Sequence, residues 1–163
     1  MNSKTLKSSI DGPAGALEIA VDTPAAESRG VAVIAHPHPL FAGTMDNKVV
    51  QTLARAFVQC GWTAVRFNFR GVGASAGTHD DGRGELDDFL AVVAHAEFLQ
   101  KNGGAGPALA LAGFSFGAYV TTHAFERLTK NRVMMMDGTH LFPMERPQAT
   151  AAAVEAALLN MLA

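Results

Sequence analysis

A serine between two glycines, followed downstream by a histidine, is the part of this sequence best suited to chemistry. Ser115 is the middle residue of GFSFG (113–117), which fits the G-x-S-x-G pattern of a nucleophilic serine on a strand–turn–helix elbow. A serine hydroxyl is a poor nucleophile at neutral pH until an imidazole removes its proton. In this arrangement the base follows the serine in chain order. Only His123 and His140 lie downstream of Ser115.

His140 is the predicted base. His123 falls two turns into the helix expected after Ser115, where its side chain would point away from the hydroxyl. His140 lies in DGTHLFPMERP, between a short apolar stretch at 132–136 and the last predicted helix. A base histidine belongs in such a loop after a late strand. The alternative is a surface or structural role for His140.

The acid that would orient this base has several candidates. Asp137 stands three residues before His140, and Gly138 permits a tight reversal between them. We predict Asp137 as the acid, facing Nδ1 of the imidazole while Nε2 faces the serine. The alternatives are a plain turn at Asp137, Glu145 as the acid, a carboxylate from the acidic segment Asp80–Asp88, or no acid at all.

The elements that must position these residues alternate between strands and helices. Two short strands joined at Gly12–Pro13 open the chain, and later strands are predicted at 31–35, 62–69, 107–113 and 132–136. Apolar spacing predicts helices at 46–59, 85–100, after Ser115, and from Pro147 onward. This order predicts one α/β domain over residues 1–163, with a mainly parallel sheet and helices on both faces.

Three segments resemble the α/β-hydrolase superfamily, in particular its small dienelactone-hydrolase-like members. They are HPHPLFAGTMDNKVVQTLARAF, VRFNFRGVGASAG and LAGFSFGAYV, and they span about Val31 to Leu128. The resemblance implies a minimal core without a lid and an oxyanion hole built partly by the Phe116 N–H. The second donor would come from the HPHPL loop. One alignment with the superfamily's His–Gly pair makes it Leu40, and a shift by one pair makes it His38.

The resemblance also gives the Gly-rich loop RGVGASAG a place after the fourth strand. There Arg70 and Ser75 would help to build the floor of the site, or would simply hold a structural turn. His36 and His38 face the same way in an extended segment, and only His79 could join them as metal ligands. We therefore expect a structural role for these two histidines, and neither a metal nor an organic cofactor.

The sequence departs from the superfamily after the nucleophile helix. Related hydrolases have two further strand–helix units there, whereas AFERLTKN passes directly to RVMMMDGTH in this chain. The strand at 132–136 would then be an uncovered sheet edge, which tends to pair with another chain. We expect a homodimer through this edge, or an exchange of C-terminal segments that brings His140 to the partner's Ser115.

Composition limits the other functions. The chain has 163 residues, of which 48% are hydrophobic, a net charge of −2 and a single cysteine, Cys60. The charge gives no general reason to expect nucleic acid or an anionic membrane as partner. No apolar run approaches the roughly 20 residues of a membrane span, and the N-terminus lacks a signal-peptide run. A lone cysteine fits a reducing compartment, so we expect a cytoplasmic protein.

These observations predict a serine carboxylesterase that hydrolyses short acyl esters, with a small-molecule ester as substrate. Short chains are expected because no lid or long insertion is available to line an acyl tunnel. A peptide or lactone hydrolase using the same site is one alternative, because specificity depends on pocket shape. A non-catalytic module derived from a hydrolase is the other.

Overall fold

The computed structural model describes residues 5–102, 105–128, 148–149 and 152–156. In chain order its elements are β1 (Thr5–Gly12), β2 (Gly15–Asp22), β3 (Gly30–Ala35), the short 3-10 helix η1 (Pro39–Phe41), α1 (Lys48–Gln59), β4 (Thr63–Phe67), α2 (Arg83–Asn102), β5 (Ala108–Gly113) and α3 (Phe116–Arg127). Residues 148–149 and 152–156 are also helical. The strand predicted at 132–136, with Asp137 and His140, lies outside the described residues.

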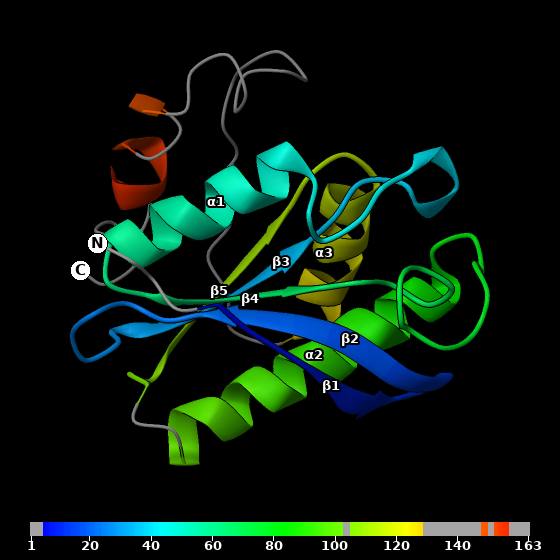
Figure 1. Cartoon of the computed structure of the whole chain (residues 1–163), viewed down its shortest axis with the longest axis horizontal. Helices are drawn as coiled ribbons and strands as arrows, with labels where there is room; N and C mark the ends of the chain where they lie inside the picture. The colour runs from blue at the N-terminus through cyan, green and yellow to red at the C-terminus, as the bar shows by residue number, and fades with distance from the viewer. Residues whose placement is uncertain (1–4, 103–104, 129–147, 150–151, 157–163) are drawn as a thin grey trace.

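The five strands form one mixed sheet in the order β1-β2-β4-β3-β5 (Figure 1). β3 pairs in parallel with both β4 and β5, as the alternation of strands and helices predicts. β1 and β2 form an antiparallel hairpin, because a turn of two residues can join only antiparallel neighbours. β2 also pairs antiparallel with β4. The predicted α/β sheet is confirmed, and its N-terminal hairpin makes it mixed.

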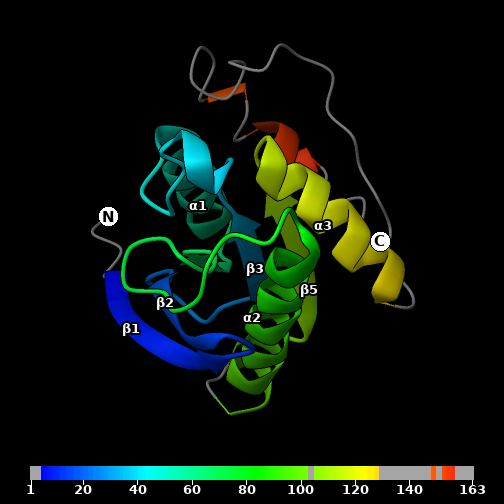
Figure 2. The ribbon, with the colours of Figure 1, turned by 90° about the vertical axis from the view of Figure 1, so that its right-hand side faces the viewer.

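Helices cover both faces of this sheet (Figures 1 and 2), and the side chains of β3 alternate between them. Val31, Val33 and Ala35 belong to the apolar cluster under α2 and α3. Ala32 and Ile34 belong to the cluster under α1, which also contains Val154. All six residues of β3 are buried, as expected of a central parallel strand covered on both sides.

The parallel strands β3, β4 and β5 end at the same edge of the sheet. The loops that follow them therefore gather there, and such carboxyl ends are where open α/β sheets bind their ligands. These loops carry the predicted oxyanion segment, the Gly-rich segment and Ser115. Among the described helices, none is long and apolar enough to cross a membrane.

A buried ion pair joins the hairpin to the parallel strands. Arg66 Nε of β4 lies 3.0 Å from Asp22 Oδ2 of β2, and the two side chains are 6% and 9% exposed. Arg66 Nη1 also donates to Met45 O at 2.9 Å and to Asp46 Oδ1 at 3.1 Å. Thr5 donates its hydroxyl proton to the other oxygen of Asp22. These bonds satisfy charges that would be costly to bury alone.

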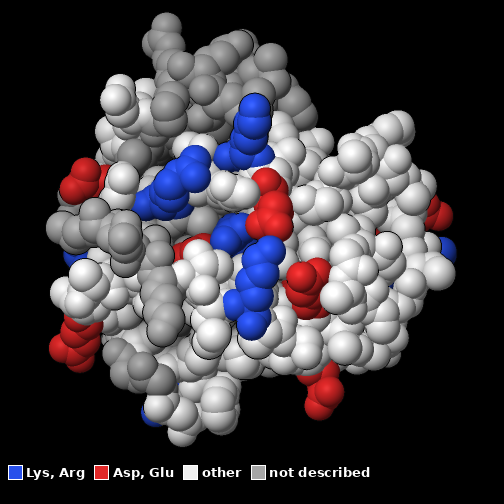
Figure 3. All heavy atoms as spheres, viewed as in Figure 1, with Lys and Arg blue, Asp and Glu red and all other residues white. Residues whose placement is uncertain are grey.

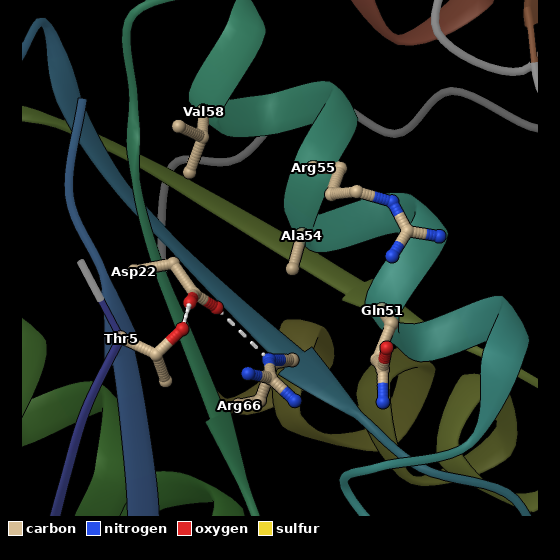
Figure 4. Close-up of a pocket in the computed structure, with 7 residues that line it drawn as sticks. All are labelled: Thr5, Asp22, Gln51, Ala54, Arg55, Val58 and Arg66. Carbon is tan, nitrogen blue, oxygen red and sulfur yellow. Dashed lines mark hydrogen bonds and ion pairs between the residues drawn. The ribbon is translucent and has the colours of Figure 1, made fainter. Parts of the chain in front are cut away.

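The same pair lines a hollow of about 180 Å³ beneath α1 (Figure 4). Figure 3 shows basic and acidic side chains close together on this face of the molecule. The hollow contains none of the predicted site residues. Its polar groups stabilise the sheet, and we do not place the reaction there.

Replacement of Arg66 by methionine tests this buried pair. The variant leaves Asp22 buried without its cation, so we expect the free energy of unfolding to fall by about 3 kcal/mol. The control is Lys7→Ala, because Lys7 pairs with Asp46 where both side chains are about half exposed. That variant should lose less than about 1 kcal/mol. Urea denaturation measures both, and equally small losses would contradict a structural role for the buried pair.

Candidate active site

Ser115 occupies a backbone conformation that residues with a side chain rarely adopt. It lies between β5 and α3 with φ 56° and ψ −120°. Such a conformation costs about 1–3 kcal/mol and persists only where its surroundings impose it. The residue is exposed, and its side chain makes no capping hydrogen bond to α3. The hydroxyl is therefore presented at the end of β5 and is not used as a helix cap.

The two glycines of GFSFG are required because backbone segments nearly touch at the elbow. A Cβ on Gly113 would lie 2.4 Å from the carbonyl carbon of Gly117. A Cβ on Gly117 would lie 2.5 Å from the carbonyl oxygens of Ala35 and His36, at the end of β3. Phe114 N–H donates to Ala35 O at 3.2 Å in the same contact. The glycines thus let α3 begin directly against the end of β3.

Two backbone N–H groups beside this elbow have no acceptor among the described residues. Phe116 is the first residue of α3, so its N–H has no acceptor within the helix. The N–H of Leu40, the donor predicted from one alignment, donates instead to His38 Nδ1 at 3.2 Å. Within the described ranges, no hydrogen bond uses the N–H of Phe116 or of His38. Of the two donors that the resemblance offered, His38 is therefore the one without an acceptor among the described residues.

The ring of His38 packs against the elbow. Its centroid lies 4.7 Å from that of Phe116, 4.9 Å from that of His79 and 5.1 Å from that of Phe41. His79 in turn lies 5.7 Å from Phe116, centroid to centroid. The sequence had suggested His79 only as a metal ligand, and its place beside the elbow was missed. The only signal available was a histidine at the start of the acidic segment that follows the Gly-rich loop.

His36 is buried and holds two loops together. Its Nε2 accepts the Phe69 N–H at 3.1 Å, so the ring proton is on Nδ1, which lies 2.6 Å from Pro37 O. Burial lowers the pKa of His36 to about 4. Both nitrogens are thus occupied by protein groups, in keeping with the structural role expected for this histidine. In the part of the chain that the structure covers, no three His, Cys, Asp or Glu residues form a metal site.

Arg70 and Ser75 fix the Gly-rich loop. Arg70 makes a two-pronged ion pair with the buried Asp88 of α2, at 2.8 and 3.0 Å, and this contact raises the pKa of Arg70. Ser75 Oγ accepts the Glu18 N–H at 2.9 Å and donates to Asn68 O at 2.7 Å. Both side chains are therefore engaged within the protein, as the structural-turn alternative expects.

The remaining candidates for base and acid lie in different places. His140, Asp137 and Glu145 are outside the described residues, so they remain predictions. His123 is exposed on α3 and its Nδ1 lies 2.9 Å from Tyr119 O. Carboxylates of the acidic segment accept hydrogen bonds from backbone N–H groups of that segment, or contact histidine and arginine side chains. These contacts include those of Asp80 with Arg83, Glu85 with His79, Asp87 with Arg127, and Asp88 with Arg70.

The sheet order and the strained serine between strand and helix define an α/β-hydrolase core, as the sequence resemblance implied. The sequence model of the X-Pro dipeptidyl-peptidase (S15 family) matches residues 11–137, and the chain belongs to this family. Among other relatives, a protein of Rickettsia prowazekii described as uncharacterized is 39% identical over 111 residues, which are 68% of this chain and 45% of that protein.

Two solved structures are more informative about the class. An α/β serine hydrolase homologue from Coxiella burnetii is 42% identical with a TM-score of 0.69, over 79% of this chain and 60% of that one. An α/β serine hydrolase without a lid from Xanthomonas campestris is 43% identical with a TM-score of 0.68, over 78% and 58%. The chain thus spans less than two thirds of each of these relatives. The comparisons show that the chain shares the core fold of α/β serine hydrolases, and the Xanthomonas relative is described as lacking a lid.

The strain at Ser115 can be measured. Glycine adopts a positive φ at little cost whereas alanine does not, so Ser115→Gly should be more stable than Ser115→Ala by about 1 kcal/mol. Both variants lack the hydroxyl, which makes each the control for the other. The free energy of unfolding from urea denaturation decides the point. A glycine variant less stable than the alanine variant would show that the elbow is not strained at this residue.

The depressed pKa of His36 predicts a loss of stability in acid. Between the unfolded value of 6.5 and the folded value of about 4, the unfolded chain binds more protons than the folded one. The free energy of unfolding should therefore fall as the pH decreases through this window, by up to about 3 kcal/mol. In His36→Gln this part of the fall should vanish, while His123→Gln should keep it. The free energy of unfolding would be measured by denaturation at pH 4.5 and at pH 7.5. An equal decrease in His36→Gln and in the wild type would refute the assignment.

Proposed function

We propose that this chain is a serine carboxylesterase that hydrolyses short-chain acyl esters through an acyl-enzyme on Ser115. The observation that carries the proposal is the exposed, uncapped Ser115 on a strained elbow. The N–H of Phe116 beside it has no acceptor within the described ranges. A serine that served only to cap α3 would bond to the first turn of that helix. The serine hydrolase type of the solved relatives supports the same chemistry.

The proposed reaction has two halves. Ser115 Oγ attacks the ester carbonyl while His140 takes its proton and then delivers it to the leaving alcohol. A water activated by His140 next attacks the acyl-enzyme, which releases the carboxylic acid and restores the serine hydroxyl. Asp137 would hold the imidazole in the required orientation. The assignments of His140 as base and Asp137 as acid are predictions from the sequence.

The oxyanion of each tetrahedral intermediate would be held by the N–H groups of Phe116 and His38. His38 replaces Leu40 in this role because the Leu40 N–H already donates to the His38 ring. A well-placed donor of this kind contributes about 3 kcal/mol to the stability of the transition state. Oxyanion donors are effective when their positions are fixed before the substrate binds, and η1 keeps this loop short and folded.

Small, partly apolar esters suit the described surroundings of this site. Leu40 and Phe41 of η1 are 69% and 83% exposed, and the Phe41 ring lies beside that of His38. These side chains offer an apolar contact for a short acyl or alkoxy group at the mouth of the site.

We also propose a cytoplasmic homodimer, paired through the strand predicted at 132–136.

Peptide hydrolysis is the second candidate function, because the family to which the chain belongs is described as an X-Pro dipeptidyl-peptidase family. It would use the same serine and the same oxyanion donors. An anionic group that captures the positively charged amino terminus of a peptide would distinguish it. Direct comparison of ester and dipeptide substrates is therefore part of the test, and a chain inactive on both would favour a non-catalytic module.

Hydrolysis of 4-nitrophenyl acetate and butyrate by the purified chain tests the proposal, with Gly-Pro-4-nitroanilide as the peptide substrate. Ser115→Ala and His140→Ala should each lower kcat/KM for the esters by at least about a thousandfold. Asp137→Asn decides the acid, because an orienting carboxylate also matters strongly for kcat. Ser9→Ala, at an exposed position of β1, is the control and should change nothing.

Two outcomes would contradict the esterase. One is a wild type no faster on esters than Ser115→Ala, and the other is a preference for the dipeptide substrate. Light scattering of the same sample tests the dimer: a mass of one chain would contradict it.

A further inference from the structure

His79 contacts both the loop after β3 and the start of α3, which meet at the elbow. It belongs to the loop between β4 and α2, and its side chain is only 12% exposed. Its ring contacts His38 from the loop after β3 and Phe116 from the start of α3, at centroid distances of 4.9 and 5.7 Å. His38 and Phe116 also contact each other at 4.7 Å. These three rings form one cluster, and two of them belong to His38 and Phe116, whose backbone N–H groups have no acceptor in the described part of the chain.

Glu85 holds His79 in place from the buried side. Its side chain is fully buried at the start of α2, and Oε1 lies 2.7 Å from His79 Nδ1. This contact brings the carboxylate and the ring together without a well-directed hydrogen bond. Glu85 is itself fixed by the backbone, since Oε1 accepts the Asp80 N–H at 2.9 Å and Oε2 accepts the Gly82 N–H at 2.8 Å. The carboxylate is therefore a rigid support for the imidazole.

The backbone fixed by Glu85 also lies against α3. A Cβ on Gly82 would be 3.0 Å from a ring carbon of Tyr119 and 3.8 Å from one of Phe116. Gly82 has φ +93°, so the position needs glycine both for this close approach and for its backbone conformation. One buried carboxylate thus places both His79 and the neighbouring backbone against the first turn of α3.

His79 is poorly placed to act as a base. Nδ1 faces Glu85, and Nε2 lies 3.4 Å from Asp81 Oδ1. A general base for Ser115 would need one ring nitrogen directed at the hydroxyl. Asp80 and Arg83, which follow His79 closely in the sequence, pair with each other at 3.1 Å. The contacts of His79 therefore point to packing and positioning.

We propose that His79, supported by Glu85, is a positioning residue that sets the distance between the His38 and Phe116 N–H groups. The inference rests on the proposed function, in which these two groups hold the oxyanion. Such donors work only within about 2.7–3.1 Å of the developing charge, and a misplacement of about 1 Å can cost a hundredfold in rate. The ring contacts the rings of both donor residues, and its loss would let these two residues shift relative to each other.

Three substitutions separate the ring from its polar atoms. His79→Phe keeps an aromatic ring, and Glu85 retains its two backbone donors in that variant. His79→Gln keeps a polar group for Glu85 but no ring, and His79→Ala keeps neither. We expect the alanine and glutamine variants to lose at least about tenfold in kcat on 4-nitrophenyl butyrate, with KM changed less than about threefold. The phenylalanine variant should stay within about threefold of the wild type.

The control is His95→Ala, which removes a half-buried imidazole on α2 that stacks on Phe98 away from the elbow. It should leave kcat unchanged. Wild-type kcat in His79→Ala would overturn the proposal. A phenylalanine variant as slow as the alanine variant would also overturn it, because kcat would then depend on the polar contact of His79 and not on its ring.

A measurement that needs no turnover separates this inference from the proposed function. Backbone 1H–15N spectra report the surroundings of the His38 and Phe116 N–H groups directly. Both resonances should shift in His79→Ala and remain near their wild-type positions in His79→Phe and His95→Ala. If the wild type hydrolyses no ester but these shifts occur, the positioning role stands and the esterase fails. If the wild type is active and the two resonances do not move, the positioning role fails alone.

Discussion

The contact between the first turn of α3 and the end of β3 is the constraint on which the rest of the site depends. Gly117 lies so close to the Ala35 and His36 carbonyl oxygens that no side chain fits between them. In this tight turn Ser115 has a positive φ, and its hydroxyl makes no capping bond to the helix that follows. The close approach also brings the HPHPL loop, which leaves β3 at this point, beside the N–H of Phe116. The nucleophile and its surroundings thus follow from one steric fit between a strand and a helix.

Buried polar contacts hold the loops around that fit. His36 ties the loop after β3 to Phe69 after β4, and Arg70 ties the same region to Asp88 of α2. Glu85 fixes the following loop through two backbone N–H groups. Each buried group has partners, so each resists movement more than an apolar contact of similar size would. A site made of three loops can in this way keep its donor positions fixed.

Much of this architecture could be predicted because its signals are local. The hairpin at Gly12–Pro13, the apolar run of β3 and the spacing of α1 each lie within a short window of sequence. The elbow motif likewise contains its own steric explanation. The pairing of β2 with β4 could not be predicted, since it joins residues far apart and the alternation of elements indicated a mainly parallel sheet without its strand order.

The missed details of the site are of two kinds. The choice of His38 over Leu40 depends on a side-chain cap, the bond from the Leu40 N–H to the His38 ring, which the motif does not encode. The place of His79 depends on three loops meeting in space, and no spacing in the sequence reports such a meeting. His140 and Asp137 remain predictions from chain order and from the superfamily resemblance.

The central claim is that Ser115 is an activated nucleophile, and covalent labelling tests it most directly. The folded chain would be treated with a fluorophosphonate, which reacts with activated serines, and the modified residue located by mass spectrometry. The account predicts a single adduct on Ser115 and none on the Ser115→Ala variant. A folded wild-type chain that acquires no adduct at Ser115 would contradict the account, even with the strained backbone conformation of the elbow intact.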